Sequence, residues 1–598
     1  MNTARTLVRS SLDHPVLLDR IGDEDDLSGA GVNSGELIRL ALACEDHLGR
    51  ALGDEELAGL TTVRAVAELI GELVPEEPAD MWLAQLIQRG LDRRPDALAL
   101  RDVRRDVTWT RLHRDVQALA TRLRSGAAAG DGSGASTAGS GAAPGDRVLV
   151  VSGNRVEVLE TYLACALAGL VAVPVNPALA DPELLAVLDS VEPTVAVVEG
   201  AAAARLRAAR PGLDLLDITT VEALPDAGSP LDAGASGQGD PVAILHTSAT
   251  TGRAKGVVVD QRSLQVNALS WMADVRPEPE TPFLNAGPLF HGSMVIALDH
   301  LAAGGTVCVL DRFTPQGCLA ALETWRIEHA FLVPSMVRLL LDAKGLPDAD
   351  LSALRLLLYG AAPMPEDLAR EARTRLGADL QGIYGITEGG GPALSLRPDD
   401  PVGPPPVPGA VCLGTPMLGT RTRIVADDGR EPGPGGIGEL HLGGDGLMQG
   451  YWKNPDATSE VLRDGWLNTR DLCCTGADGR IWTVDRRNDL ILRGGQNVYP
   501  AEIEHVLRRS PHVADVVVVP LPSEIWGQVP VAFVQPAEGC RFDALELLDL
   551  CVEGLAAYKR PGHFLPIDRV PRNPAGKALR VQLRELAREL TTGTEHAA

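Results

Sequence analysis

The chain has 598 residues, of which 45% are hydrophobic and 23% charged, so it can form several domains with ordinary buried cores and is not disordered throughout. Asp and Glu (80) outnumber Lys and Arg (55), which gives a net charge of −25. Such an acidic protein is repelled by nucleic-acid phosphates and anionic lipid surfaces, so we expect no nucleic-acid partner and no membrane role.

Nine cysteines are scattered along the chain without a CxxC or Cys/His framework, which is typical of a reducing compartment and argues against structural zinc or a disulfide scaffold. We interpret the adjacent Cys473 and Cys474 as strand residues. No apolar run reaches the ~20 residues that span a bilayer, and the first residues lack an apolar signal core. These features favour a soluble, cytoplasmic protein.

Residues 1–74 are short, polar and helical in pattern. Apolar residues from Leu37 to Leu48 recur at helical spacing after Ser34, which we expect to cap this helix. A second helix is predicted after Thr61-Thr62. The proline- and acid-rich residues 75–80 are predicted to be a linker, so the first 74 residues are expected to form a small all-α bundle.

From 81 to about 487 short β-rich apolar runs alternate with amphipathic stretches, as at 146–153, 156–168, 169–176 and 193–200. This alternation predicts an α/β domain with a parallel sheet covered by helices. Residues 125–145 are rich in Gly, Ala and Ser and are predicted to be a disordered insertion. Residues 401–409 are proline-rich and predict a loop. The last stretch, 488–598, is expected to form a small, separate domain of helices and strands.

The densest signal is the run 244–256, where a short apolar segment leads into Thr247-Ser248-Ala249-Thr250-Thr251-Gly252 and Lys255. Hydroxyls, backbone N–H groups and a mobile cation suit a polyphosphate, because each phosphate oxygen accepts several hydrogen bonds. The order of elements differs from the strand–GxxxxGK[ST]–helix loop of common NTPases. Alone, such a run also occurs in ordinary surface loops.

This loop resembles the TSGTTGxPKG signature of the adenylate-forming superfamily, which includes acyl- and aryl-CoA synthetases, nonribosomal adenylation domains and luciferases. Seven further matches follow in the family's order, at 287–292, 359–363, 384–388, 438–440 through 450–452, 469–471, 485–486 through 498–504, and 573–577. The resemblance covers roughly residues 80–598. It implies a large N-terminal adenylation domain (81–487) and a small mobile α+β C-terminal lid (488–598), hinged near Asn488.

The resemblance also implies roles for single residues. Tyr384 would lie against adenine, Asp471 would accept both ribose hydroxyls, and Arg486 would support the ribose and phosphates. Glu388 would bind Mg²⁺, a hard cation that takes one or two carboxylates together with phosphate oxygens. The full set of expected ATP-binding positions is Thr247, Ser248, Thr250, Thr251, Gly252, Lys255, Gly360, Ala361, Ala362, Tyr384, Gly385, Asp471 and Arg486.

The catalytic residues that the resemblance implies are Lys577, Glu388, Thr387 and His291. Attack of a carboxylate on the α-phosphorus builds negative charge, and a cation fixed there stabilises the transition state more than the ground state. Lys577 is expected to be that cation. His291 would line the acyl pocket and gate the thiol tunnel. Gly494 and Gly495 would let a pantetheine arm pass once the lid has rotated.

The chain departs from the family pattern at several positions. Ala249 and Ala254 stand where the family prefers Gly and Pro. Arg470 replaces the Gly before the ribose Asp, and Asn488 replaces the hinge Asp or Lys. None of these changes removes a cation or carboxylate that adenylation requires, so we expect them to affect rate more than reaction type.

Residues 1–74 resemble an acyl carrier protein, in which the serine at the start of the second helix takes 4′-phosphopantetheine from a phosphopantetheinyl transferase. The matching serine is Ser34, flanked by Asn33 and Gly35 where an Asp and a Leu are usual. The alternative is a helical bundle retained for folding or docking.

Together the two resemblances predict an ATP-dependent ligase that turns a carboxylic acid into an acyl-adenylate with release of pyrophosphate. The acyl group is expected to move to a pantetheine thiol of a carrier, in cis or in trans, because tethering raises effective concentration toward mM. Three alternatives remain: CoA as acceptor, capture of the adenylate by an amine, and a catalytically silent docking module. Fusion with a carrier suggests natural-product biosynthesis. The sequence does not identify the acid.

Overall fold

The computed structural model describes residues 2–594 except 23–24, 54–55, 58, 71–81, 127–140, 228–236, 248–254, 487–488, 494–495, 524 and 574–575. The chain divides into two compact units, Met1–Asp80 and Met81–Ala598. Most of the expected insertion at 125–145 lies outside the described residues, although Ser125 itself ends a helix. The predicted linker, the expected hinge residue Asn488 and Gly494-Gly495 lie outside them too.

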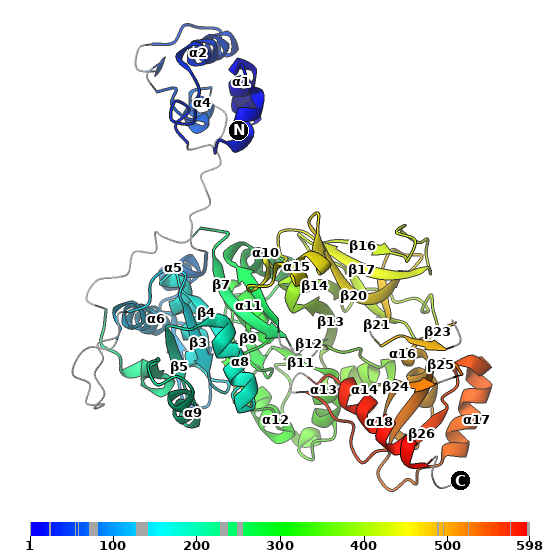
Figure 1. The fold of residues 1–598 in the computed structure, drawn as a ribbon. Helices are drawn as coiled ribbons and strands as arrows, with labels where there is room; N and C mark the ends of the chain where they lie inside the picture. The colour runs from blue at the N-terminus through cyan, green and yellow to red at the C-terminus, as the bar shows by residue number, and fades with distance from the viewer. Residues whose placement is uncertain are drawn as a thin grey trace. The chain divides into compact units, whose positions relative to one another are not determined.

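The first unit is all-helical (Figure 1). Its elements are α1 (Asn2–Ser11), the 3₁₀ helix η1 (Pro15–Arg20), α2 (Ser34–Leu48) and α4 (Val63–Leu69). Helices α2 and α4 agree with the sequence pattern, whereas α1 was not predicted. Their buried apolar side chains, including Val8, Leu40 and Val66, form a separate core.

The expected cap of α2 is wrong by one residue. Asn33 is extended (φ −85°, ψ 165°), and its side chain accepts hydrogen bonds from the amides of Gly35 and Glu36. Glu36 in turn accepts from the Asn33 amide at 2.8 Å. This reciprocal pair satisfies the first amides of the helix, so Asn33 is the cap and Ser34 is the first helical residue.

The second unit contains a seven-stranded sheet in the order β18-β8-β7-β4-β3-β5-β6. The strands are β3 (Arg147–Val151), β4 (Val171–Val175), β5 (Val195–Val198), β6 (Asp214–Asp217), β7 (Pro241–Thr247), β8 (Lys255–Asp260) and β18 (Gly450–Tyr451). Strands β3 to β7 are parallel, as predicted, because Val- and Ala-rich runs suit strands buried on both faces. Strands β8 and β18 are antiparallel additions.

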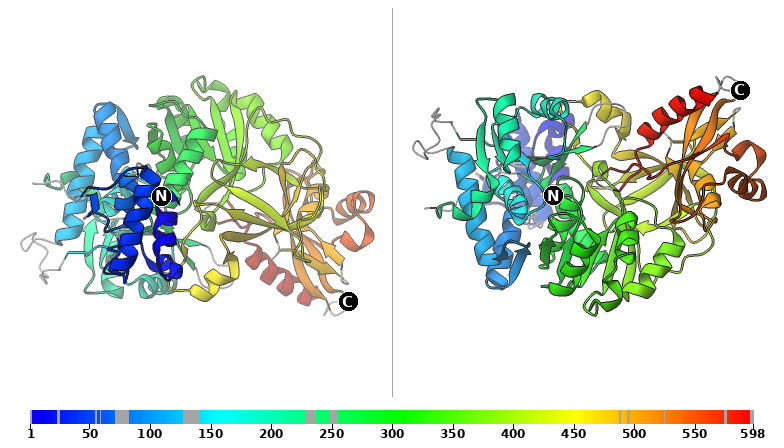
Figure 2. Two further views of the ribbon diagram at one scale, coloured as in Figure 1. Left: turned by 90° about the horizontal axis from the view of Figure 1, so that it is seen from above. Right: turned by 90° about the horizontal axis from the view of Figure 1, so that it is seen from below.

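A 14-stranded sheet forms the second layer of strands (Figure 2). Its parallel part contains β9 (Pro282–Asn285), β10 (Thr306–Val309), β11 (His329–Leu332), β12 (Leu356–Gly360) and β13 (Asp379–Ile386), with β1 (Leu98–Arg101) and β2 (Asp106–Thr108) at the edge. Its antiparallel part contains β14 (Gly391–Leu396), β15 (Val411–Pro416), β16 (Arg421–Val425), β17 (Ile437–Gly443), β19 (Leu462–Arg463), β20 (Trp466–Thr475) and β21 (Ile481–Arg486).

The predicted α/β alternation is therefore wrong between 391 and 486. Strands β13 to β21 pair antiparallel, and short turns join many of them, so they need no crossover helices. Cys473 and Cys474 lie in β20, as predicted, and both are buried. Residues 401–409 form a loop, also as predicted.

Helices fill the space between the two sheets and cover their outer faces. The helices of this unit are α5 (Trp82–Arg93), α6 (Trp109–Ser125), α7 (Val156–Leu167), α8 (Asp181–Val191), α9 (Ala201–Ala209), α10 (Gln261–Asp274), α11 (Ser293–Ala302), α12 (Pro315–Thr324), α13 (Pro334–Leu341), α14 (Glu366–Leu376) and α15 (Pro455–Val461). Apolar residues of α6, α7 and α11 share one core with both sheets. Helices α8 and α9 cover the outer face of one sheet, and α12 to α14 that of the other.

The C-terminal part carries its own sheet, in the order β23-β22-β25-β24 with β26 beside β25. The elements are β22 (Ile491–Arg493), β23 (Gln496–Val498), β24 (Val513–Ser523), β25 (Gly527–Pro536), β26 (His563–Pro566), α16 (Pro500–Leu507), α17 (Ala544–Gly554) and α18 (Arg580–Thr594). Helices α16 and α17 pack on one face and α18 on the other (Figure 2).

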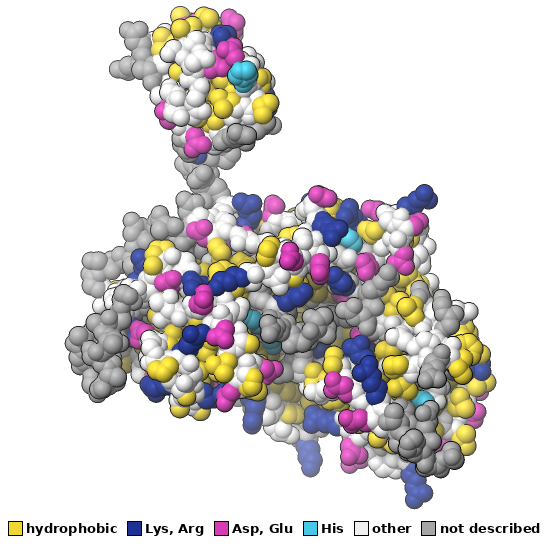
Figure 3. All heavy atoms as spheres, viewed as in Figure 1, with side chains coloured by type: hydrophobic (Ala, Val, Ile, Leu, Met, Phe, Trp, Pro, Cys, Tyr) yellow, Lys and Arg dark blue, Asp and Glu magenta, His cyan; other side chains and the backbone are white. Residues whose placement is uncertain are grey.

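Basic and acidic side chains are interspersed on the face of the second unit shown in Figure 3. Among the described residues, none of the helices combines the length and the apolar character needed to cross a membrane.

Candidate active site

Lys577 lies in a turn of the C-terminal part that packs against the start of α13. Its amide donates to Asn573 Oδ1 at 2.8 Å, and the Asn573 amide donates to the Lys577 carbonyl at 2.8 Å. Gly576 has φ +77°, and a Cβ there would lie 2.9 Å from Ser335 Oγ. Only glycine therefore allows this turn to sit against the start of α13.

The turn brings the Lys577 charge near His291, which precedes α11. Burial, with the positive charge of Lys577 as a smaller cause, lowers the pKa of His291. The ring of Phe290 lies edge-on to the imidazole, with centroids 4.8 Å apart. A neutral imidazole at this place can accept a hydrogen bond or line a pocket without repelling the lysine.

Tyr384 and Asp471 meet although 87 residues separate them. The Tyr384 hydroxyl donates to Asp471 Oδ2 at 2.6 Å. Burial, followed by the Asp471 charge, raises the pKa of Tyr384 well above its usual value. Asp471 lies in β20 opposite Arg486 of β21. A carboxylate oxygen accepts more than one hydrogen bond, so Asp471 can still receive a diol.

Gly360 is the last residue of β12, and Ala361 and Ala362 follow it directly. A Cβ on Gly360 would lie 2.4 Å from the carbonyl of Ile383, so glycine is required for β12 and β13 to approach there. Ala361 has φ +64°, an uncommon conformation for a residue with a Cβ, and its side chain is exposed. Gly385 lies in β13, where a Cβ would meet the Gly391 carbonyl at 2.1 Å.

Thr387 and Glu388 form the 3₁₀ turn η4 (Thr387–Gly389) directly after β13. The Glu388 carbonyl accepts from the Met448 amide at 3.0 Å, and its Oε1 accepts from the Tyr451 hydroxyl at 3.0 Å. Oε2 has no hydrogen bond within the part of the chain that the structure describes. One half-buried carboxylate with an open oxygen fits Mg²⁺ when phosphate oxygens supply the other ligands. No cluster of three or more His, Cys, Asp or Glu side chains suitable for a metal occurs among the described residues.

The predicted phosphate loop connects two antiparallel strands. Thr247 ends β7 and pairs with Lys255 at the start of β8. Ser248, Thr250, Thr251 and Gly252 lie outside the described residues. The Lys255 ammonium lies 4.7 Å from the ring centroid of Tyr451, close enough for a cation–π contact. A strand–loop–strand arrangement agrees with the sequence-based distinction from the P-loop.

Ser34 belongs to the other unit, where its side chain is exposed in the first turn of α2. Ile38 and Leu42, one and two turns further along α2, are also exposed (63% and 55%). An exposed serine beside exposed apolar side chains is accessible to a modifying enzyme.

Sequence reasoning missed two features of this site. Tyr451 was noted only as part of a Gly-Tyr-Trp match, yet it contacts both Glu388 and Lys255. Arg470, noted only as a replacement for the family's Gly, has φ +60°, the left-handed conformation that a glycine adopts at less cost.

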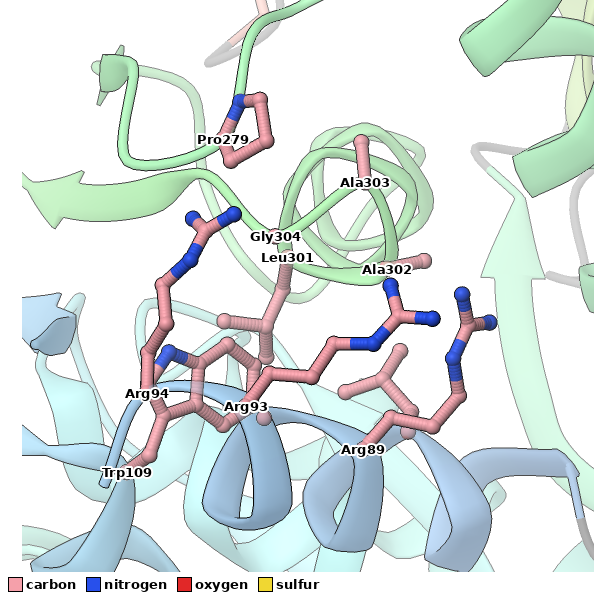
Figure 4. A pocket seen from close by; sticks show the side chains of 11 residues that line it. Arg89, Arg93, Arg94, Trp109, Pro279, Leu301, Ala302, Ala303 and Gly304 are labelled. Atoms are coloured by element: carbon pink, nitrogen blue, oxygen red, sulfur yellow. The ribbon is translucent and has the colours of Figure 1, made fainter.

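A shallow pocket of about 70 Å³ lies apart from these residues, between α5 and the end of α11 (Figure 4). Arg89, Arg93 and Arg94 surround it, and Trp109 and Leu301 form part of its apolar lining. None of the predicted site residues lines this pocket.

The two large sheets, the Lys577 turn against His291 and the start of α13, and the Tyr384–Asp471 and Tyr451–Glu388 contacts on the same unit are the features of an adenylate-forming ligase. The AMP-binding enzyme family matches residues 136–452 and its C-terminal domain matches 502–577. A phosphopantetheine attachment site domain matches residues 5–70. The chain belongs to the AMP-binding enzyme family, and it is an ATP-dependent acid–thiol ligase by class with an N-terminal phosphopantetheine attachment domain.

The relatives include a feruloyl-CoA synthase of Amycolatopsis sp, 36% identical over 82% of this chain and 96% of the relative. The fatty acid–[acyl-carrier-protein] ligase ScoC of Streptomyces coeruleorubidus is 35% identical over 80% of this chain and 92% of its own. The crystal structure of ATP-bound MatB from Rhodopseudomonas palustris superimposes with a TM-score of 0.76 at 28% identity, covering 85% of this chain and 99% of that one.

Proposed function

We propose that this enzyme activates a carboxylic acid as its acyl-adenylate and transfers the acyl group to the thiol of a phosphopantetheine carried by a protein. In the first step a carboxylate oxygen bonds to the α-phosphorus of ATP and the bond to the β-phosphate breaks, which releases pyrophosphate. In the second step the thiolate attacks the acyl carbon, and AMP leaves. The observation that carries the proposal is the Lys577 turn seated beside His291 on the same unit as Glu388 and Asp471.

Each residue has a proposed role in the first step. Lys577 stabilises the charge that develops at the α-phosphorus, and Asp471 accepts the ribose hydroxyls, with Tyr384 fixing its carboxylate. Arg486 supports the ribose and phosphates. Glu388 holds Mg²⁺, which neutralises phosphate charge, and Thr387 lies beside it. Lys255 and the hydroxyls of 247–251 hold the β- and γ-phosphates. The adenine lies along Gly360 to Ala362.

The second step is proposed to follow a rotation of residues 488–598 about Asn488, in which Gly494-Gly495 replace the Lys577 turn. His291, whose neutral form burial favours, would then line the thiol path. A separate lid domain with this boundary remains our prediction.

The acceptor is proposed to be phosphopantetheine on Ser34, or on a partner carrier. The exposed position of Ser34 at the start of α2 and the match of residues 5–70 to phosphopantetheine attachment domains support this choice. The ligase ScoC, whose name specifies an acyl-carrier-protein acceptor, supports it too. CoA is the second candidate, because the feruloyl-CoA synthase is equally similar.

The substrate class follows from the same relatives. An aromatic acid of the feruloyl kind and a fatty acid are the two acids that their names specify. We propose aryl and aliphatic carboxylic acids as the first panel, with amino acids as a third group.

The test uses the full chain after treatment with a phosphopantetheinyl transferase and CoA. Intact mass should rise by one phosphopantetheinyl group, and Ser34→Ala should not change. Adding ATP, Mg²⁺ and the acid panel should then add one acyl group to the modified chain. Acyl-CoA in solution with no acylated protein would favour the CoA alternative, and acyl-amine products would favour capture by an amine. Absence of adenylation with every acid would leave the docking-module alternative.

A further inference from the structure

Tyr451 contacts two residues of the proposed site at once. Its hydroxyl donates to Glu388 Oε1 at 3.0 Å, and its ring lies 4.7 Å from the Lys255 ammonium. The side chain is nearly buried, with 9% of its surface exposed. One aromatic residue therefore connects the carboxylate proposed for Mg²⁺ with the lysine proposed for the phosphates.

The strand register explains the contact with Lys255. Tyr451 of β18 pairs with Val257 of β8. Side chains two residues apart on a strand point to the same face, so Lys255 and Val257 share the face on which Tyr451 lies. Diagonal neighbours across a ladder are within reach of aromatic and long side chains.

The backbone around Tyr451 is fixed to both partners. The Met448 amide donates to the Glu388 carbonyl at 3.0 Å, and the Trp452 amide donates to the Gly256 carbonyl at 2.7 Å. The Tyr451 amide itself donates to Thr458 Oγ1, in the middle of α15, at 2.9 Å. With its main chain held at these points, the Tyr451 ring has a fixed position between β8 and η4.

We propose that Tyr451 is a positioning residue that orients Glu388 toward Mg²⁺ and Lys255 toward the phosphates. The inference rests on the proposed roles of those two residues. The hydroxyl occupies one oxygen of the carboxylate and leaves Oε2 for the metal. The ring contacts the ammonium by its π-face, which holds the Lys255 side chain toward the phosphate loop.

The two contacts can be separated by substitution in the full-length protein. Tyr451→Phe keeps the ring and removes the hydroxyl, whereas Tyr451→Leu removes both. Tyr558→Phe, a change in the partly exposed tyrosine of the C-terminal part, is the matched control. Calorimetry measures ATP affinity in EDTA and in Mg²⁺, and thermal unfolding checks that each variant is folded.

For Tyr451→Phe we expect the gain in ATP affinity on adding Mg²⁺ to fall by about three- to tenfold, the range for one hydrogen bond, with ATP affinity in EDTA unchanged. For Tyr451→Leu, affinity in EDTA should fall as well, by about two- to fivefold. If Tyr451→Leu does not fold, Tyr451→Phe carries the test.

A wild-type Mg²⁺ gain in Tyr451→Phe would overturn the inference. An equal loss of ATP affinity in Tyr451→Phe with and without Mg²⁺ would overturn it too. The same holds if Mg²⁺ does not change the ATP affinity of the wild type. The measurement needs no acid substrate. If the protein binds ATP as expected but none of the acids leads to pyrophosphate release, the proposed function is refuted and the role of Tyr451 stays intact.

Discussion

At the scale of single residues, the Lys577 side chain and the turn that holds it concentrate positive charge next to a half-buried histidine. An ammonium held in place before the reaction stabilises the transition state without reorganisation at the moment of attack. The Lys577 backbone is positioned by its hydrogen bonds with Asn573 and by the close contact of Gly576 with the start of α13.

Lys577→Ala should slow acid-dependent ATP–pyrophosphate exchange by about 10²- to 10³-fold, the scale for losing one preorganised donor. The matched change Lys344→Ala, at an exposed lysine of the large domain, should leave the rate unchanged. Exchange at the wild-type rate in Lys577→Ala would remove the lysine from the mechanism.

His300 gives a second prediction at this scale, one that concerns stability. It is fully buried, its Nε2 lies 3.0 Å from the Thr281 carbonyl, and burial lowers its pKa to about 3. The unfolded histidine has a pKa near 6.5, so as pH falls below that value the unfolded state takes up a proton that the folded state excludes, and stability is lost.

In His300→Gln this loss is absent. Between pH 7 and pH 5 the free energy of unfolding of the variant should therefore fall by about 2 kcal/mol less than that of the wild type, measured by chemical denaturation at both pH values. The exposed His563→Gln should follow the wild type. An equal fall in His300→Gln and wild type would show that His300 is protonated in the folded protein.

At the scale of elements, the Lys577 turn packs against the start of α13 through Gly576, and we expect this contact to break when the C-terminal part rotates. Gly576 has φ +77°, and a Cβ there would lie 2.9 Å from both Ser335 and Val333. Any larger residue must move the turn away from the large domain.

Gly576→Ala should slow adenylation by about tenfold or more, because the added methyl displaces Lys577 and the left-handed backbone costs ~1 kcal/mol or more. Transfer from a preformed acyl-adenylate to thiol should change little, since that step is proposed to use another pose. Gly539→Ala is a close control: the same φ of +77°, but no atom within 4 Å of the new Cβ. If Gly576→Ala and Gly539→Ala slow adenylation equally, the cause is backbone strain and not the lost contact of the turn with α13.

The sequence predicts some elements well and others poorly, for physical reasons. Val171–Val175 is apolar on both faces and is bounded by turn signals, so its strand is evident. Strand β15 mixes exposed, half-buried and buried residues without alternation, and both β15 and β17 have shifts in register, so the sequence pattern does not indicate which strands they pair with. The Tyr451–Glu388 contact joins residues 63 apart, and nothing local in the sequence marks it.

At the scale of the whole molecule, the two compact units have separate cores. A protein built in this way can separate acid activation from acyl carriage. Residues 81–598 expressed alone should fold and release pyrophosphate with the same acid preference as the full chain, while self-acylation should disappear. Ser34→Ala in the full chain should give the same pattern. Loss of adenylation in both would show that the first unit contributes to the first step.

The most direct test of the account is ATP–pyrophosphate exchange by the pure full-length protein with aryl, aliphatic and amino acids, each run beside Lys577→Ala. We predict exchange that depends on one class of acid and on Mg²⁺, and that falls by about 10²-fold or more in the variant. Exchange with none of the acids, or exchange that the substitution leaves unchanged, would contradict it.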